Sequence, residues 1–167
     1  MLKIINDLRP FFENCYGRIN IRQYARLMKI TPPTASALLK TYAKEGLLIK
    51  ERDRNYIIFY ANKESYVFVD LSRIYWRHIL RELLDFLVKK LANPTIILFG
   101  SLSKAEVKPD SDIDIAIINS EEIDLSQFRE KLDREIQDFW FKSLREPNRE
   151  LANNIINGYV LTGKMKL

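Results

Sequence analysis

The chain has 167 residues, of which 47% are hydrophobic and 29% are charged, and its formal net charge at pH 7 is +5. This length suits one domain or two small ones, and no apolar run reaches the roughly 18–20 residues that span a bilayer. Cys15 is the only cysteine and His78 the only histidine; this excludes an internal disulfide and a cysteine-based zinc site, and it argues against catalytic triads and histidine-ligated metals. We therefore expect a cytoplasmic protein without a signal peptide, with carboxylates as the main candidates for chemistry.

The positive charge is concentrated in the first part of the chain. Residues 1–65 contain 12 Lys and Arg against 6 Asp and Glu, residues 66–93 contain 5 against 3, and residues 94–167 contain 10 against 13. A basic front and a slightly acidic back suggest different partners for the two halves. The alternative is that the positive charge of the front is only a solvated surface.

Three helices and a hairpin are expected in the first 60 residues. Apolar residues at helical spacing predict helices over 2–14, 21–28 and 32–45. Thr31 is placed to cap the third helix, and Pro32 suits its first position, where a missing N–H costs nothing. Residues 47–50 and 56–60 are rich in β-formers and flank the charged stretch 51–55, so they predict a hairpin with a charged tip.

Helices and strands alternate in the rest of the chain. A helical pattern over 65–91 predicts a helix that connects two domains. The continuous apolar run 95–99 predicts a strand buried on both faces. The pattern further predicts strands over 112–118 and 136–141, helices over 124–135 and 147–157, and a last extended segment at 159–161. We therefore expect an α+β protein with a first domain over 1–64, a connecting helix over 65–93 and a second domain over 94–167.

The segment INIRQYARLMKITPPTASALLKTYAKEGLLIKERDRNYIIFY resembles the winged helix-turn-helix family over about forty residues. The resemblance implies that the helix over 32–45 enters the major groove of duplex DNA, with the tip 51–55 beside it. This helix has no Arg, Asn or Gln, the residues that read base edges most selectively. A protein-contact or dimerisation module remains the alternative. The candidate DNA-binding residues are Thr31, Thr34, Ser36, Lys40, Arg52 and Arg54.

A second pattern, FGSLSKAEVKPDSDIDIAII, covers residues 99–118. Strand periodicity places Asp112 and Asp114 on one face, with Ile113, Ile115 and Ile117 on the other. Two neighbouring carboxylates repel each other, and Mg²⁺ is the natural compensating cation because it prefers hard oxygen ligands and nucleotide phosphates. Gly100 lets the backbone approach a ligand closely, and Ser101 can hold phosphate oxygens at a helix start.

This arrangement resembles the polymerase-β-like nucleotidyltransferase superfamily, and the downstream REIQ…NIINGYVLTG resembles the end of its minimal members. The match runs from about residue 95 to residue 163 and implies a small mixed-sheet fold. It also implies transfer of a nucleoside monophosphate from an NTP to an acceptor hydroxyl, with release of pyrophosphate. By this resemblance Asp112 and Asp114 hold Mg²⁺ or Mn²⁺. The residues expected to bind the nucleotide are Gly100, Ser101, Lys104 and Ser111.

The family also has a third carboxylate, on the strand that follows the long helix. Register against the family places this position at Gln137, which is a poor metal ligand and no base. Asp138 is the alternative and is retained as a candidate catalytic residue with Asp112 and Asp114. In a regular strand its side chain points to the other face, so only a bulge would bring it to the pair.

Three functions follow from these resemblances. One is an enzyme that modifies a protein or nucleic acid found through a DNA-binding domain. The second is a DNA-binding transcriptional regulator whose second domain binds nucleotide without turnover. The third is an antitoxin resembling the minimal nucleotidyltransferases that adenylylate HEPN toxins, although Lys104 stands where arginine is common in that group. The expected partners are an NTP, duplex DNA and, for the third function, a toxin protein. No membrane is expected, and a homodimer is left open.

Overall fold

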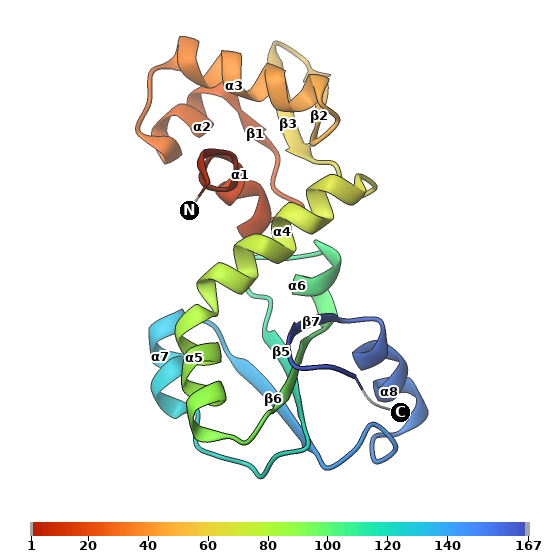
Figure 1. The fold of residues 1–167 in the computed structure, drawn as a ribbon. Coiled ribbons are helices and arrows are strands. Elements are labelled where there is room, and N and C mark those ends of the chain that lie inside the picture. The colour runs from red at the N-terminus through yellow and green to blue at the C-terminus, as the bar shows by residue number, and fades with distance from the viewer. Residues whose placement is uncertain (1, 166–167) are drawn as a thin grey trace. The chain divides into compact units, whose positions relative to one another are not determined.

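The structure is a computed structural model that describes residues 2–165, so Met1, Lys166 and Leu167 at the ends of the expected domains lie outside it. The described chain divides into two compact units (Figure 1). The first comprises the residues up to Ser72 together with Ala105–Pro109, and the second comprises Arg73–Lys104 and the residues from Asp110 onward. The division falls inside the helix α4 (Tyr66–Ile79). The domain boundaries at residues 64 and 93 stay a prediction.

In the first unit, helices precede a β-hairpin in the order that the sequence predicts. Strand β3 (Tyr56–Ala61) pairs antiparallel with both β1 (Ile19–Asn20) and β2 (Leu48–Asp53). Strand β2 continues to Asp53, so the turn of the hairpin is limited to Arg54 and Asn55 and is tighter than expected. The elements are α1 (Lys3–Glu13), β1 (Ile19–Asn20), α2 (Ile21–Met28), α3 (Pro32–Lys44), β2 (Leu48–Asp53) and β3 (Tyr56–Ala61).

Side chains fix the start of both α2 and α3. The hydroxyl of Thr31 accepts from the backbone N–H of Thr34, and Pro32 opens α3, as predicted. At α2, Asn20 and Gln23 form a capping box in which each side chain accepts a hydrogen bond from the other residue's backbone N–H. Such caps satisfy N–H groups that the helix itself leaves without partners.

A buried carboxylate joins the helices of the first unit. Asp7 of α1 accepts a 2.7 Å hydrogen bond from the hydroxyl of Tyr42 in α3 and is paired with Lys3 at 2.6 Å. Its backbone oxygen accepts from the hydroxyl of Tyr24 in α2 at 2.8 Å. A buried polar group is costly unless it is hydrogen-bonded, so these contacts fix how the three helices pack.

The second unit is built on a sheet with strand order β6-β5-β4-β7. Strand β4 is antiparallel to both of its neighbours, whereas β5 and β6 are parallel. The helical pattern over 65–91 corresponds to two helices, α4 and α5. They are separated at Leu80 (φ −80°, ψ 1°). The elements after α4 are α5 (Arg81–Lys90), β4 (Thr95–Leu98), α6 (Gly100–Lys104), β5 (Ile113–Ile118), α7 (Ser126–Leu132), β6 (Ile136–Phe141), α8 (Arg149–Ile156) and β7 (Tyr159–Thr162).

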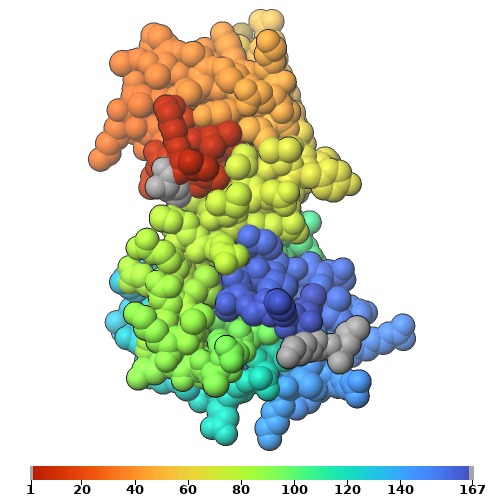
Figure 2. All heavy atoms as spheres, in the orientation of Figure 1, coloured from red at the N-terminus to blue at the C-terminus, as the bar shows by residue number. Residues whose placement is uncertain are grey.

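Helices cover both faces of this sheet (Figure 1). On one side α5 and α7 pack together through Phe86 and Phe128, whose ring centroids are 5.2 Å apart. On the other side Ile155 of α8 is fully buried in a cluster with Ala116 and Ile118 of β5. In Figure 2 the side chains of α5 (green) border those of the C-terminal elements (blue). The cluster around Ala116 and Ile118 makes this face of the sheet apolar along most of its length.

Within residues 2–165, no helix combines the length and the apolar character needed to cross a bilayer.

Candidate functional site

Gly100 lies where β4 ends and α6 begins, directly against a carboxylate of the neighbouring strand. Its φ of +66° is in the left-handed region that favours glycine. A Cβ atom at this position would overlap Oδ2 of Asp114. The backbone N–H of Phe99 donates to the carbonyl oxygen of Asp114 at 3.0 Å, so the pairing of the two strands extends to this point. Only a residue without a side chain leaves room for this carboxylate.

Asp112 and Asp114 precede and follow Ile113, the first residue of β5. The strand itself begins one residue later than expected, so Asp112 stands just before it. Ile113 and Ile115 are fully buried on the opposite face, whereas both aspartates are half-buried. Burial raises the pKa of the Asp114 carboxyl, and the negative charge of Asp112 raises it further. The rise indicates that a cation would relieve the repulsion between these groups.

Gln137 lies beside this pair on the neighbouring strand. The parallel register of β5 and β6 aligns Asp114 with Gln137, and residues aligned in this way place their side chains on the same face. The side-chain Nε2 of Gln137 donates a hydrogen bond of 2.6 Å to Oδ2 of Asp112. The position that register against the family assigns to a third carboxylate is therefore next to the pair and holds an amide.

Asp138, the other candidate for that role, lies on the opposite face of β6. The register aligns it with Ile115 rather than Asp114. Its carboxylate is paired with Arg129 at 2.6 Å and accepts a 2.7 Å hydrogen bond from Nε1 of Trp140. Strand β6 pairs with β5 without a bulge from Ile113 to Ile118, so nothing turns Asp138 toward the aspartates. Asp138 thus points away from Asp112 and Asp114, as a regular strand predicts, and the alternative in which a bulge brings it to the pair finds no support in this register.

A known protein family agrees with the geometry of this site. The family model described as "Polymerase beta, Nucleotidyltransferase" matches residues 81–166. The chain belongs to this nucleotidyltransferase family. No curated protein matches the chain. Membership in the family indicates nucleotidyl transfer as the general activity of the second unit.

The donor set of the nucleotidyltransferase unit suits a hard divalent cation only in part. The carboxylates of Asp112 and Asp114 are the ligand type that Mg²⁺ prefers, and Mg²⁺ commonly completes its coordination with phosphate oxygens and water. Among the described residues, no group of three or more His, Cys, Asp or Glu side chains is placed to hold a metal ion. The two aspartates can therefore serve one cation together with a phosphate ligand, and Gln137 adds no charge to them.

Of the expected nucleotide-binding residues, Gly100 contacts Asp114 directly, Ser101 follows Gly100 in α6, and Ser111 precedes Asp112 in the chain. Ser101 is half-buried in the first turn of α6, and Lys104 is exposed at its end. Arg134 was not expected: its Nη1 donates to the backbone oxygen of Ser111 at 2.5 Å, and its guanidinium lies 5.2 Å from the ring of Trp76. Arg134 therefore holds the residue immediately before Asp112. The register between β5 and β6 indicates this contact, because Ile113 aligns with Ile136 and residue 111 then lies beside residue 134.

The candidate DNA-binding residues lie on the first unit. The hydroxyls of Thr31 and Thr34 are hydrogen-bonded to each other at 2.9 Å at the start of α3. Lys40 is exposed further along α3, and Ser36 is half-buried. Arg52 and Arg54 are exposed at the end of β2 and in the turn. These positions leave the cationic groups accessible to a large anionic partner.

Proposed function

We propose that the second unit transfers a nucleoside monophosphate from an NTP to a hydroxyl of a protein or nucleic acid, with Mg²⁺ or Mn²⁺ held by Asp112 and Asp114. The packing of the Asp114 carboxylate against Gly100 supports this best, because it places an acidic pair beside the turn that opens α6. When bound, the cation supplies positive charge to the phosphates and favours deprotonation of the attacking hydroxyl.

The protein's own groups orient the nucleotide in this proposal. Ser101 offers a hydroxyl, and Lys104 offers a flexible cation one helical turn further on. Arg134 fixes the backbone at Ser111, so that Asp112 is held in place. The new bond joins the acceptor oxygen to the α-phosphorus as the bond to pyrophosphate breaks. Gln137 cannot accept the proton of the acceptor, because an amide is not a base at neutral pH. We therefore expect the transfer to be slow.

A second function is favoured by the same Gln137. If the missing carboxylate abolishes transfer, the unit still binds a nucleotide with its cation. The chain then acts as a DNA-binding transcriptional regulator, or as an antitoxin that sequesters a toxin protein. The hydrogen bond from Gln137 to Asp112 is the specific observation behind this alternative.

For the first unit we propose a winged helix-turn-helix that binds duplex DNA. Helices α1 to α3 followed by the β2–β3 hairpin have the element order of that family. The exposed Lys40, Arg52 and Arg54 would neutralise phosphates, and the hydroxyls of Thr31, Thr34 and Ser36 would approach the groove.

Calorimetric titration of the full chain with ATP, in Mg²⁺ or in EDTA, tests the nucleotide site. We expect binding only with the cation, and its loss in the double variant Asp112→Ala/Asp114→Ala. The matched control is Glu121→Ala/Glu122→Ala, which removes the same charge from an exposed loop. Equal affinity in Mg²⁺ and EDTA would contradict the metal site.

Incubation with labelled NTPs, Mg²⁺ and cell extract tests transfer itself. A labelled acceptor that depends on Asp112 and Asp114 supports the enzyme. Nucleotide binding without any labelled acceptor supports the regulator, or an antitoxin that does not transfer a nucleotide.

A further inference from the structure

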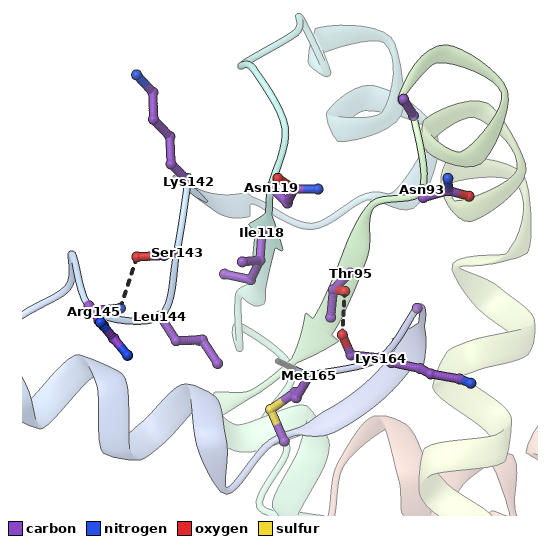
Figure 3. Close-up of a pocket in the computed structure, with 12 residues that line it drawn as sticks. Asn93, Thr95, Ile118, Asn119, Lys142, Ser143, Leu144, Arg145, Lys164 and Met165 are labelled. Atoms are coloured by element: carbon purple, nitrogen blue, oxygen red, sulfur yellow. Dashed lines mark hydrogen bonds between the residues drawn. The ribbon is translucent and has the colours of Figure 1, made fainter. Parts of the chain in front are cut away.

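A cavity lies in the nucleotidyltransferase unit at the opposite end of the sheet from the aspartates. It has a volume of about 900 Å³ and opens where β5 and β6 end (Figure 3). Ile118, the last residue of β5, lines it. Ile118 lies four positions after Asp114 along β5, which corresponds to about 13 Å. Neither Asp112 nor Asp114 lines this cavity, so it is separate from the carboxylate pair.

The charged side chains that line this cavity are all cationic. They are Lys142 and Arg145, which follow β6, and Lys164, which follows β7. Within residues 2–165 their ammonium and guanidinium groups make no hydrogen bond or ion pair. Glu146 is close by, since its carboxylate accepts from the backbone N–H of Lys142, but it does not line the cavity. The cavity thus gathers positive charge in the half of the chain that is otherwise slightly acidic.

The inner surface of the cavity combines apolar side chains with neutral polar groups. Ile118 and Leu144 point toward one another, while Lys142 and Lys164 extend outward from opposite sides (Figure 3). Asn119 and Ser143 supply an amide and a hydroxyl to the lining. Lysine has a long flexible stem, so both cations can turn over a molecule that rests on the apolar surface.

These features together select a class of ligand. Cavities of about 300–1,000 Å³ suit small molecules, and an apolar surface with a few polar groups is typical of them. The rim of cations favours an anion, and phosphate is an anion that Lys and Arg bind well. We propose that this cavity binds a phosphorylated small molecule of nucleotide size, independently of the NTP and cation at Asp112 and Asp114.

Nuclear magnetic resonance of the full ¹⁵N-labelled chain in EDTA tests this site with AMP as the probe. Without a divalent cation the acidic pair should not attract a nucleotide, so binding there is suppressed. We expect AMP to shift the backbone signals of Asn119, Ser143 and Gly163, which line the cavity. Adenosine, which lacks the phosphate, should bind at least about tenfold more weakly, because it loses the charge-assisted hydrogen bonds.

Charge-reversing substitutions complete the test. Lys142→Glu/Lys164→Glu should weaken AMP binding by more than about tenfold, and the milder Lys142→Ala should weaken it less. The control is Arg77→Glu, an exposed cation of α4 outside this cavity. The proposal is overturned if AMP shifts signals only around Gly100 and Asp112, if adenosine binds as well as AMP, or if Lys142→Glu/Lys164→Glu keeps full affinity. A failure of cation-dependent ATP binding would overturn the proposed function instead and leave this result unchanged.

Discussion

The side-chain amide of Gln137 donates a 2.6 Å hydrogen bond to Oδ2 of Asp112. The bond joins β6 to the residue just before β5 and places a neutral group at the position that register against the family assigns to a third carboxylate. It also occupies an oxygen that a cation would otherwise approach. In the proposed function, both effects would weaken metal-dependent transfer while the two carboxylates remain in place.

Replacement of Gln137 by aspartate should therefore increase transfer. Gln137→Asp supplies both a third charge and a group that can accept a proton, and general-base catalysis contributes about 10²–10⁴-fold in enzymes. We expect an increase of at least about tenfold in the rate of label incorporation in Mg²⁺. In EDTA the same variant should be less stable than the wild type, because three neighbouring carboxylates repel one another.

Asp138→Asn is the matched control for this experiment, because it changes the adjacent residue on the other face of β6. It should leave transfer nearly unchanged and should reduce stability, since Arg129 loses its charged partner. Loss of a robust wild-type activity in Asp138→Asn would show that Asp138, not Gln137, occupies the third position.

Gly100→Ala should abolish cation-dependent nucleotide binding. The added Cβ would collide with the Asp114 carboxylate, and the φ of +66° would strain any residue other than glycine. Gly46→Ala separates the two effects, because Gly46 has a φ of +73° and nothing within 4 Å of an added Cβ. We expect Gly46→Ala to cost about 1–2 kcal/mol of stability and to leave ATP binding intact. Equal binding by both variants in calorimetry would show that the contact between Gly100 and Asp114 is dispensable.

Asp114→Asn should stabilise the metal-free protein in a pH-dependent manner. Burial and the charge of Asp112 raise the pKa of this carboxyl above its ordinary value of 3.8, so ionisation costs more in the folded state than in the unfolded one. Below 3.8 both states are protonated and the penalty is absent; it develops as pH rises through the raised pKa and is constant above it.

Urea unfolding in EDTA at pH 3.5 and pH 7 measures this effect. We expect the variant to gain up to about 1 kcal/mol at pH 7, because a half-buried carboxylate is still partly screened by solvent, and little at pH 3.5. Mg²⁺ should reduce the gain by stabilising the charged wild type. Asp110→Asn, an exposed carboxyl in the same loop, is the control. A loss of stability that is the same at both pH values would contradict the assignment.

Arg52→Ala/Arg54→Ala should weaken the binding of duplex DNA by the full chain. If each arginine neutralises one phosphate, the slope of log K against log salt should become less steep by about two. The control Lys89→Ala/Lys90→Ala removes the same charge from the end of α5 in the other unit. Electrophoretic or fluorescence titration at several salt concentrations gives both quantities. An unchanged slope in the arginine variant would exclude the hairpin from the DNA interface.

Local patterns in the sequence were sufficient to predict the part of the site that lies on neighbouring residues. A strand of alternating side chains requires Asp112 and Asp114 to share a face, and the structure confirms this, with Ile113 and Ile115 buried opposite. The choice between Gln137 and Asp138 depended on the register between two strands. That register is set by packing across the whole sheet, and no local pattern encodes it.

Other features were beyond local patterns for a similar reason. The helical spacing of apolar residues continues through Leu80, so it could not reveal that α4 ends at Ile79 and α5 begins at Arg81. The contact of Arg134 with Ser111 joins residues 23 positions apart. Each depends on how separate elements pack together, which a single sequence does not show.

The five-residue segment Ala105–Pro109 belongs to the first unit, although the residues on both sides of it belong to the second. Val107 is fully buried, and its carbonyl oxygen accepts a 2.8 Å hydrogen bond from the backbone N–H of Cys15. The polypeptide therefore passes from one unit to the other three times, and no single cut yields both of them whole. A gene fusion that exchanged the first 72 residues for an unrelated module would leave this segment without its binding surface, so a replacement of the first unit must also supply a partner for residues 105–109.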